Sequence, residues 1–138
     1  MTRQDLEKYL NLPWVLFSHP AESGAADCFS ISAYFYKEEL GIDIQYFEDV
    51  DENERKLTMG PGLIALITRR YKKFKKDFTE VTSPRVGDLV LWRVGGLVLH
   101  IGVVVSDGEQ LTSTPMSGST ISKINLDHSV FMRHNTLM

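Results

Sequence analysis

Cys28 and His100 are the residues whose types and positions could carry out covalent chemistry. Cys28 is the only cysteine, and it follows Asp27 at the start of a helical pattern. The partial positive charge and free N–H groups of a helix N-terminus favour the reactive thiolate, as does a neighbouring imidazolium. His100 lies inside an apolar segment typical of a β-strand. The two residues therefore indicate a cysteine nucleophile with a histidine base, an arrangement suited to acyl transfer.

Each of the two residues also has a purely structural interpretation. Free cysteine is among the most buried residue types, and a lone histidine in an apolar strand is more often a core residue than a catalyst. The catalytic hypothesis therefore rests on both together. The remaining histidines, His19, His128 and His134, lie in loop or polar segments and are weaker candidates. Because no cysteine or histidine pair has the short spacing of zinc ligands, we expect neither a metal site nor a cofactor.

The composition fits one globular domain over residues 1–138. Hydrophobic residues make up 43% of the chain and charged residues 24%, and the net charge of -3 argues against nucleic acid as the main ligand. No apolar run approaches the ~20 residues that span a bilayer, so we expect no membrane association. The N-terminus, Met1–Leu6, lacks the apolar region of a secretory signal peptide. With one cysteine, no internal disulfide can form.

The charged residues fall into two blocks of opposite sign. The acidic block comprises Asp43, Glu48, Asp49, Asp51, Glu52 and Glu54, and the basic run comprises Arg69, Arg70, Lys72, Lys73, Lys75 and Lys76. Apolar residues recur at helical spacing through the basic run, from Leu63 to Phe78, which places the positive charges on the opposite, solvated face of a helix. Docking of that face on an acidic partner or an anionic polymer is the alternative.

Helices are predicted first along the chain. They cover Arg3–Leu10, Cys28 to about Leu40, and about Gly62–Lys76, with a loop from Ser18 to Gly24 and a turn at Met59-Gly60. Asp27 is expected to cap the second helix by accepting backbone N–H bonds two or three residues further on. Gly41 is expected to end it.

An antiparallel sheet of about five strands is predicted after the helices. The strands cover Asp88–Val94, Leu97–Val105, Glu109–Thr114, Thr120–Ile124 and Val130–Arg133. Strict alternation along the second strand places Val98, His100 and Gly102 on one face. Since Gly102 has no side chain, a helix could approach there and bring Cys28 to His100. The expected fold class is α+β, with N-terminal helices packed on the sheet.

Several stretches together resemble the NlpC-type cell-wall peptidases, a papain-like superfamily. They are Asn11–Trp14, Gly24–Ile31, Pro84–Trp92 and His100–Val104. The resemblance implies a papain-like fold that hydrolyses amide bonds in peptidoglycan stem peptides, with Cys28 as nucleophile and His100 as base. The phrase Tyr36–Asp43 looks most like the subgroup encoded by tailed phages. This implies a place in the virion tail after synthesis in the host cytoplasm, with other tail tip or hub proteins as partners.

The third catalytic position is the main departure from the family. Relatives commonly carry a histidine on the strand after the base, at the position of Thr112. A threonine hydroxyl can accept an Nδ1–H bond from the imidazole but adds no charge. A tight turn at Asp107-Gly108 would place Ser113 on the face of His100, whereas a longer turn would place Thr112 there. The resemblance favours Thr112, and geometry alone leaves both open.

Two further departures lie close to the nucleophile. Trp14 stands where many relatives carry a tyrosine, and Ser30 replaces a glycine, so the oxyanion pocket is expected to differ. The backbone N–H of Cys28 could still donate to a developing oxyanion. Thr112, Trp14 and the two blocks of opposite charge support a second hypothesis: a structural tail-tip or hub subunit that keeps the papain-like fold without turnover.

Overall fold

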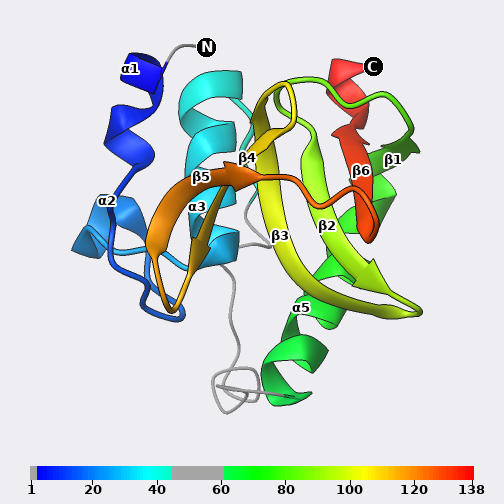
Figure 1. Ribbon diagram of the computed structural model, residues 1–138, viewed down its shortest axis with the longest axis horizontal. Helices are drawn as coiled ribbons and strands as arrows, with labels where there is room; N and C mark the ends of the chain where they lie inside the picture. The colour runs from blue at the N-terminus through cyan, green and yellow to red at the C-terminus, as the bar shows by residue number, and fades with distance from the viewer. Residues whose placement is uncertain (1–2, 45–60) are drawn as a thin grey trace.

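The computed structural model describes residues 3–44 and 61–138. Helices pack on one face of a six-stranded sheet (Figure 1). The helices are α1 (Arg3–Leu6), α2 (Pro20–Ser23), α3 (Cys28–Phe35) and α5 (Pro61–Phe74). The strands are β1 (Phe78–Val81), β2 (Leu89–Val94), β3 (Leu97–Ser106), β4 (Glu109–Thr114), β5 (Gly118–Lys123) and β6 (Ser129–His134). The expected α+β class is confirmed.

The sheet is antiparallel throughout, in the order β1-β6-β2-β3-β4-β5. α3 packs against β3 and β4, and α5 packs against β3. The main core lies between these helices and the sheet and includes Phe35 and Ile101. The opposite sheet face carries a smaller apolar cluster of Val90, Val104 and Phe131.

The helices follow their local sequence signals closely. α3 continues as a π-helix over Tyr36–Leu40, and Gly41 ends it with φ 67, a left-handed conformation that glycine adopts without steric cost. α5 is followed by a 3-10 turn over Lys75–Asp77. The first predicted helix is shorter than expected, because α1 gives way to a 3-10 turn over Glu7–Tyr9. The predicted loop from Ser18 to Gly24 contains α2.

β1 is a strand that was not predicted, because its first residue continues the apolar helical spacing of the segment before it. The apolar stripe was expected to run through Phe78, but the chain leaves the helix before it and pairs with β6, from Phe78 opposite His134 to Val81 opposite Phe131. Phe78 still packs in the core, with its ring centroid 5.3 Å from that of Phe74. Helical spacing could not distinguish the two outcomes, because Phe78 is buried in either.

The basic run is only partly solvated. Most of its side chains are exposed, as expected: Arg69, Lys72, Lys73, Lys75 and Lys76. Arg70 contradicts the expectation, because it is 1% exposed and its side chain is fully buried. Of the acidic block, Asp43 lies within the described residues, whereas Glu48–Glu54 and the predicted turn at Met59-Gly60 lie outside them. Within residues 3–44 and 61–138, no helix has the length and apolar character needed to cross a bilayer.

A bulge in β3 overturns the predicted alternation of that strand. Trp92 pairs with His100 but Arg93 pairs with Val98, so Leu99 is an extra residue in β3. Beyond an extra residue, side chains that would have pointed to one face of the sheet point to the other. Val98 therefore points into the main core rather than sharing the face of His100.

Gly102 has a different role from the one its lack of a side chain suggested. A Cβ atom there would meet Oε1 of Gln110, on the sheet face away from α3. The space is filled by Gln110 and not by a helix, so close approach at Gly102 does not bring Cys28 to His100.

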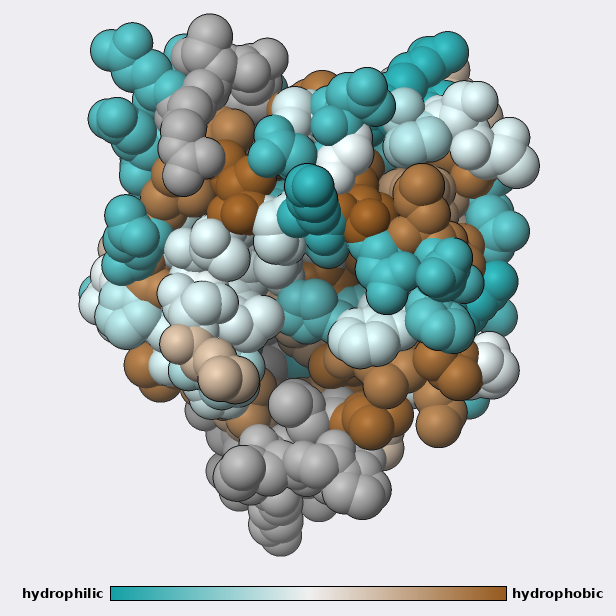
Figure 2. Space-filling model, viewed as in Figure 1, coloured by the Kyte–Doolittle hydropathy of each residue, from teal (hydrophilic) through white to brown (hydrophobic). Residues whose placement is uncertain are grey.

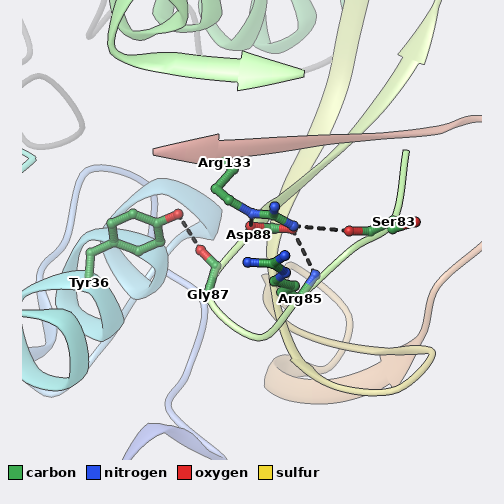
Figure 3. Close-up of polar contacts among 6 residues, drawn as sticks. All are labelled: Tyr36, Ser83, Arg85, Gly87, Asp88 and Arg133. Atoms are coloured by element: carbon green, nitrogen blue, oxygen red, sulfur yellow. Dashed lines mark hydrogen bonds and ion pairs between the residues drawn. The ribbon is translucent and has the colours of Figure 1, made fainter. Parts of the chain in front are cut away.

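The stretch Pro84–Asp88 is held by a buried ion pair (Figure 3). Arg133 of β6 donates from Nε and Nη2 to the Asp88 carboxylate, both at 2.8 Å, and from Nη2 to the Ser83 carbonyl at 2.9 Å. The hydroxyl of Tyr36, just after α3, donates to the carbonyl of Gly87. These contacts join the start of β2 to β6 and to the end of the helix that begins at Cys28.

Arg133→Gln is expected to lower the melting temperature by roughly 5–10 °C, because it leaves the Asp88 carboxylate buried without its cation. Arg93→Gln is the matched control, since its ion pair with Glu80 spans 3.5 Å at the surface. It should change the melting temperature by about 2 °C or less. Equal shifts in the two variants, measured by thermal circular dichroism, would contradict a structural role for the buried pair.

Candidate active site

Cys28 is the first residue of α3, and Asp27 is its N-cap. The Asp27 carboxylate accepts the backbone N–H groups of Phe29 at 3.0 Å and Ser30 at 2.8 Å, as predicted. The Ser30 hydroxyl in turn accepts the backbone N–H of Asp27 at 2.9 Å, which completes a capping box. The same carboxylate accepts the N–H of Phe17 at 2.8 Å. The cap thus fixes the first turn of α3, where Cys28 lies, and the preceding loop.

The Cys28 thiol is buried, with 6% of the residue exposed. Burial raises the pKa of the thiol well above its usual range, and the negative charge of Asp27 raises it further. Hydrogen bonds from the backbone of Ile101, Cys28 and Phe29 act in the opposite direction but do not overcome burial. The resting thiol is therefore protonated at neutral pH.

His100 is held by Thr112. The Thr112 hydroxyl lies against Nε2 of His100 and is 2.8 Å from the carbonyl oxygen of Ile101. A carbonyl can only accept, so the hydroxyl proton goes to Ile101 and the hydroxyl oxygen accepts the Nε2–H of His100. This arrangement corrects the expected Nδ1–H contact, and it leaves Nδ1 as the unprotonated nitrogen that can act as a base.

A second bulge selects Thr112 over Ser113. The turn at Asp107-Gly108 is tight, with Ser106 opposite Glu109, but the register then slips so that Val104 pairs with Gln110. The slip moves Thr112 to the face of His100. Ser113 faces the other way and donates its hydroxyl to the carbonyl of Ala26 at 2.8 Å, beside the cap of α3. No pattern in the sequence predicts this anchor.

Cys28 and His100 line one small cavity, which we call the inner cavity. Its volume is about 70 Å³, and its other lining residues are Trp14, Leu16, Asp27, Phe29, Ile67, Leu99, Ser113, Thr114 and Pro115. The lining is mainly apolar. Trp14 lines the same cavity as Cys28. The inner cavity is therefore lined by both a thiol and an imidazole.

The remaining histidines do not line the inner cavity. His19 caps α2 by accepting the backbone N–H of Ala21 on Nδ1 at 3.1 Å, a role that was not predicted. His134 contacts the Thr136 hydroxyl near the C-terminus at 2.8 Å. In the described part of the chain, no three acidic, cysteine or histidine residues form a group suited to a metal ion.

In the variant His100→Gln, the free energy of unfolding should fall less between neutral and acidic pH than it does in wild type. Burial lowers the pKa of His100 from 6.5 to about 4, so the imidazole stays neutral in the folded chain while the unfolded chain is protonated. The unfolded state then binds more protons within this window, and stability falls as the pH falls, by at most about 1.4 kcal/mol per pH unit. Urea unfolding at about pH 7 and pH 5 should show wild type losing roughly 1–2 kcal/mol more than the variant. Equal losses would contradict a buried neutral imidazole.

Comparisons with known proteins agree with this fold. The model of the NlpC/P60 family matches residues 16–137. The NlpC/p60 domain of the peptidoglycan hydrolase SagA superposes with a TM-score of 0.59 at 17% identity, covering 95% of this chain and 93% of that one. The P60 domain of an antigen from M. avium subspecies paratuberculosis gives a TM-score of 0.55 at 16% identity, covering 96% and 95%. No curated protein matches in sequence. With a match over nearly its whole length and a papain-like arrangement of α3 on the sheet, the chain belongs to the NlpC/P60 family.

Proposed function

We propose that this chain is a cysteine peptidase that hydrolyses amide bonds in the stem peptides of peptidoglycan. One observation carries the proposal: Cys28 and His100 line one cavity, and Thr112 holds the imidazole in the tautomer whose Nδ1 is free to accept a proton. The substrate class is supported by family membership and by the similarity in fold to a domain described as part of a peptidoglycan hydrolase.

The proposed reaction has two steps. His100 Nδ1 takes the thiol proton as the Cys28 sulfur attacks the carbonyl carbon of the amide. The oxyanion can accept a hydrogen bond from the backbone N–H of Cys28. This N–H lies at the N-terminus of α3, so it has no carbonyl partner within the helix. When the C–N bond breaks, the imidazolium gives its proton to the departing amine. Water, deprotonated by His100, then hydrolyses the thioester and restores the thiol.

The proposed reaction needs a proton transfer that has not taken place in the resting pair. The thiol and the imidazole are both neutral at pH 7, because burial raises the pKa of Cys28 and lowers that of His100. An ion pair of thiolate and imidazolium offsets part of the cost of burying each charge, since opposite charges in a medium of low dielectric attract strongly. We expect proton transfer to accompany attack rather than precede it.

We further propose that the peptidase is part of a phage tail, where it contacts other tip or hub subunits. The support is the phrase Tyr36–Asp43, which resembles the tailed-phage subgroup. In the structure Tyr36 and Leu40 bound the π-helix that follows α3, and Lys37, Glu38 and Glu39 between them are exposed. Mass spectrometry of purified virions tests this location, and absence of the chain from intact tails would refute it.

The direct test of activity is peptide release from purified peptidoglycan. The chain is incubated with walls, and the soluble products are identified by mass spectrometry. Release of stem-peptide fragments with a single new amine terminus supports the peptidase and identifies the bond cut. Release of sugars without peptides would instead indicate another reaction.

A catalytically inactive tail subunit is the second candidate. Two observations favour it: a neutral Thr112 stands where relatives commonly carry histidine, and Cys28 is 6% exposed with a raised pKa. This candidate predicts no peptide release, a Cys28 that resists iodoacetamide at neutral pH in the folded chain, and tail assembly that survives Cys28→Ala. Peptide release that depends on Cys28 would exclude it.

A further inference from the structure

A second cavity, which we call the outer cavity, lies next to His100. Its volume is about 220 Å³, and its lining includes Trp92, Gln110, Thr114, Ser122 and Asn125. Figure 2 shows this face, which is hollowed near its centre, between the β5–β6 connection and the β2–β3 hairpin of Figure 1. His100 and Thr114 line both cavities, so a ligand in the outer cavity lies beside the catalytic pair.

Most residues that line the outer cavity carry neutral polar side chains. Hydroxyl and amide side chains such as Gln110, Ser122 and Asn125 can both donate and accept hydrogen bonds. Within residues 3–44 and 61–138, the side chains of Gln110 and Ser122 make no hydrogen bond, so their polar groups are open to a ligand. Lys123 is the one residue of the lining with a formal charge at neutral pH, and the lining holds no carboxylate.

Trp92 adds an apolar surface to this polar lining. The residue is 45% exposed, and it lies directly opposite His100 in the β2–β3 register, so both side chains project from the same face. An exposed indole ring gains much contact area when a flat apolar group covers it. A sugar ring offers such a group, because its C–H bonds form apolar faces while its hydroxyl and acetamido groups project from the edge.

We propose that the outer cavity binds an N-acetylated amino sugar of the glycan strand, as a subsite beside the catalytic pair. The inference rests on the proposed function, because the subsite shares His100 with it. The hydroxyl and acetamido groups of such a sugar match the neutral donors and acceptors of the lining, and its ring can cover the exposed Trp92 indole. The inner cavity, at about 70 Å³, admits only a small side chain beside Cys28. The scissile amide then lies close to the sugar end of the stem.

Binding of a sugar without any peptide tests the subsite directly. The chain has two tryptophans, so the indole N–H resonance of Trp92 is assigned by its loss in Trp92→Phe. Titration with N-acetylglucosamine trimer should shift this resonance saturably, and Gln110→Ala should weaken binding about tenfold. Val94→Ala is the control, because Val94 is 48% exposed on the same hairpin but does not line the cavity. It should bind as wild type does.

Cleavage rates supply the second arm. Wild type should cut a disaccharide-bearing stem peptide with a kcat/KM about tenfold above that of the free peptide, and Trp92→Ala should bring the ratio toward one. Saturable sugar binding without cleavage of either substrate would refute the proposed function and leave the subsite standing. Equal rates for the two substrates, or a Trp92 resonance that moves with the free peptide but not with the sugar, would overturn the subsite.

Discussion

Cys28→Ala is expected to reduce peptide release from peptidoglycan by at least about 10⁴-fold, because the variant has no sulfur to form the thioester. The inner cavity offers no substitute nucleophile in a comparable position, since Ser113 donates its hydroxyl to the Ala26 carbonyl on the cap side of α3. Mass spectrometry of the soluble products, compared with wild type at matched concentration, measures the loss.

The control for this variant is the fold of α3. Alanine is favourable at the first helical position, and the Asp27 cap uses backbone N–H groups of Phe29 and Ser30 that the variant retains. We expect a loss of stability of about 1 kcal/mol or less, from the buried sulfur alone. An unfolded Cys28→Ala would make its inactivity uninformative, and in that case Cys28→Ser replaces it. Full wall-degrading activity in a folded Cys28→Ala would show that the nucleophile is misassigned.

The features predicted well from the sequence depend on short-range signals. Asp27 lies immediately before the helix that it caps, and Gly41 immediately after the π-helix that it ends. Capping and left-handed glycine are properties of a few consecutive residues, so they hold whatever the rest of the chain does. The place of Cys28 at a helix N-terminus was predictable for this reason.

The features predicted poorly depend on how strands pair. Neither the bulge at Leu99 nor the slip near Val105 has a local signature, because valine and leucine suit a regular strand equally well. Each bulge reverses which side chains face the helices beyond it. The side chain that supports His100 was therefore left open between Thr112 and Ser113 by geometry, and the family resemblance favoured the residue that the structure places there.

Buried charges were the other gap between sequence and structure. Arg133 and Asp88 are 45 residues apart in the chain, so no local pattern pairs them. Arg70 follows Arg69 in a basic run that was expected to face solvent, yet the side chain of Arg70 is buried. Helical periodicity places apolar side chains well, but it does not reveal which charged residue shares their face.

Thr112→Val should lower kcat by about 10- to 100-fold with a smaller change in KM. The substitution keeps the shape of the side chain but removes the oxygen that accepts the Nε2–H of His100, so the imidazole loses the contact that fixes its tautomer. In a serine protease, disturbing the charged group at this position costs about 10⁴ in kcat, and a neutral hydroxyl should contribute less. Steady-state kinetics on a soluble stem peptide separate kcat from KM.

Thr120→Val is the matched control, because Thr120 lies opposite Thr112 on β5 and lines neither cavity. It should leave kcat near wild type. Thr112→Asn, whose amide oxygen can accept the same N–H, should recover a large part of the rate lost in Thr112→Val. Both substitutions at Thr112 remove the hydroxyl that donates a hydrogen bond to the Ile101 carbonyl. A difference in rate between the two variants therefore cannot come from the loss of that bond. Equal rates in the valine and asparagine variants would mean that Thr112 acts through packing and does not orient the base.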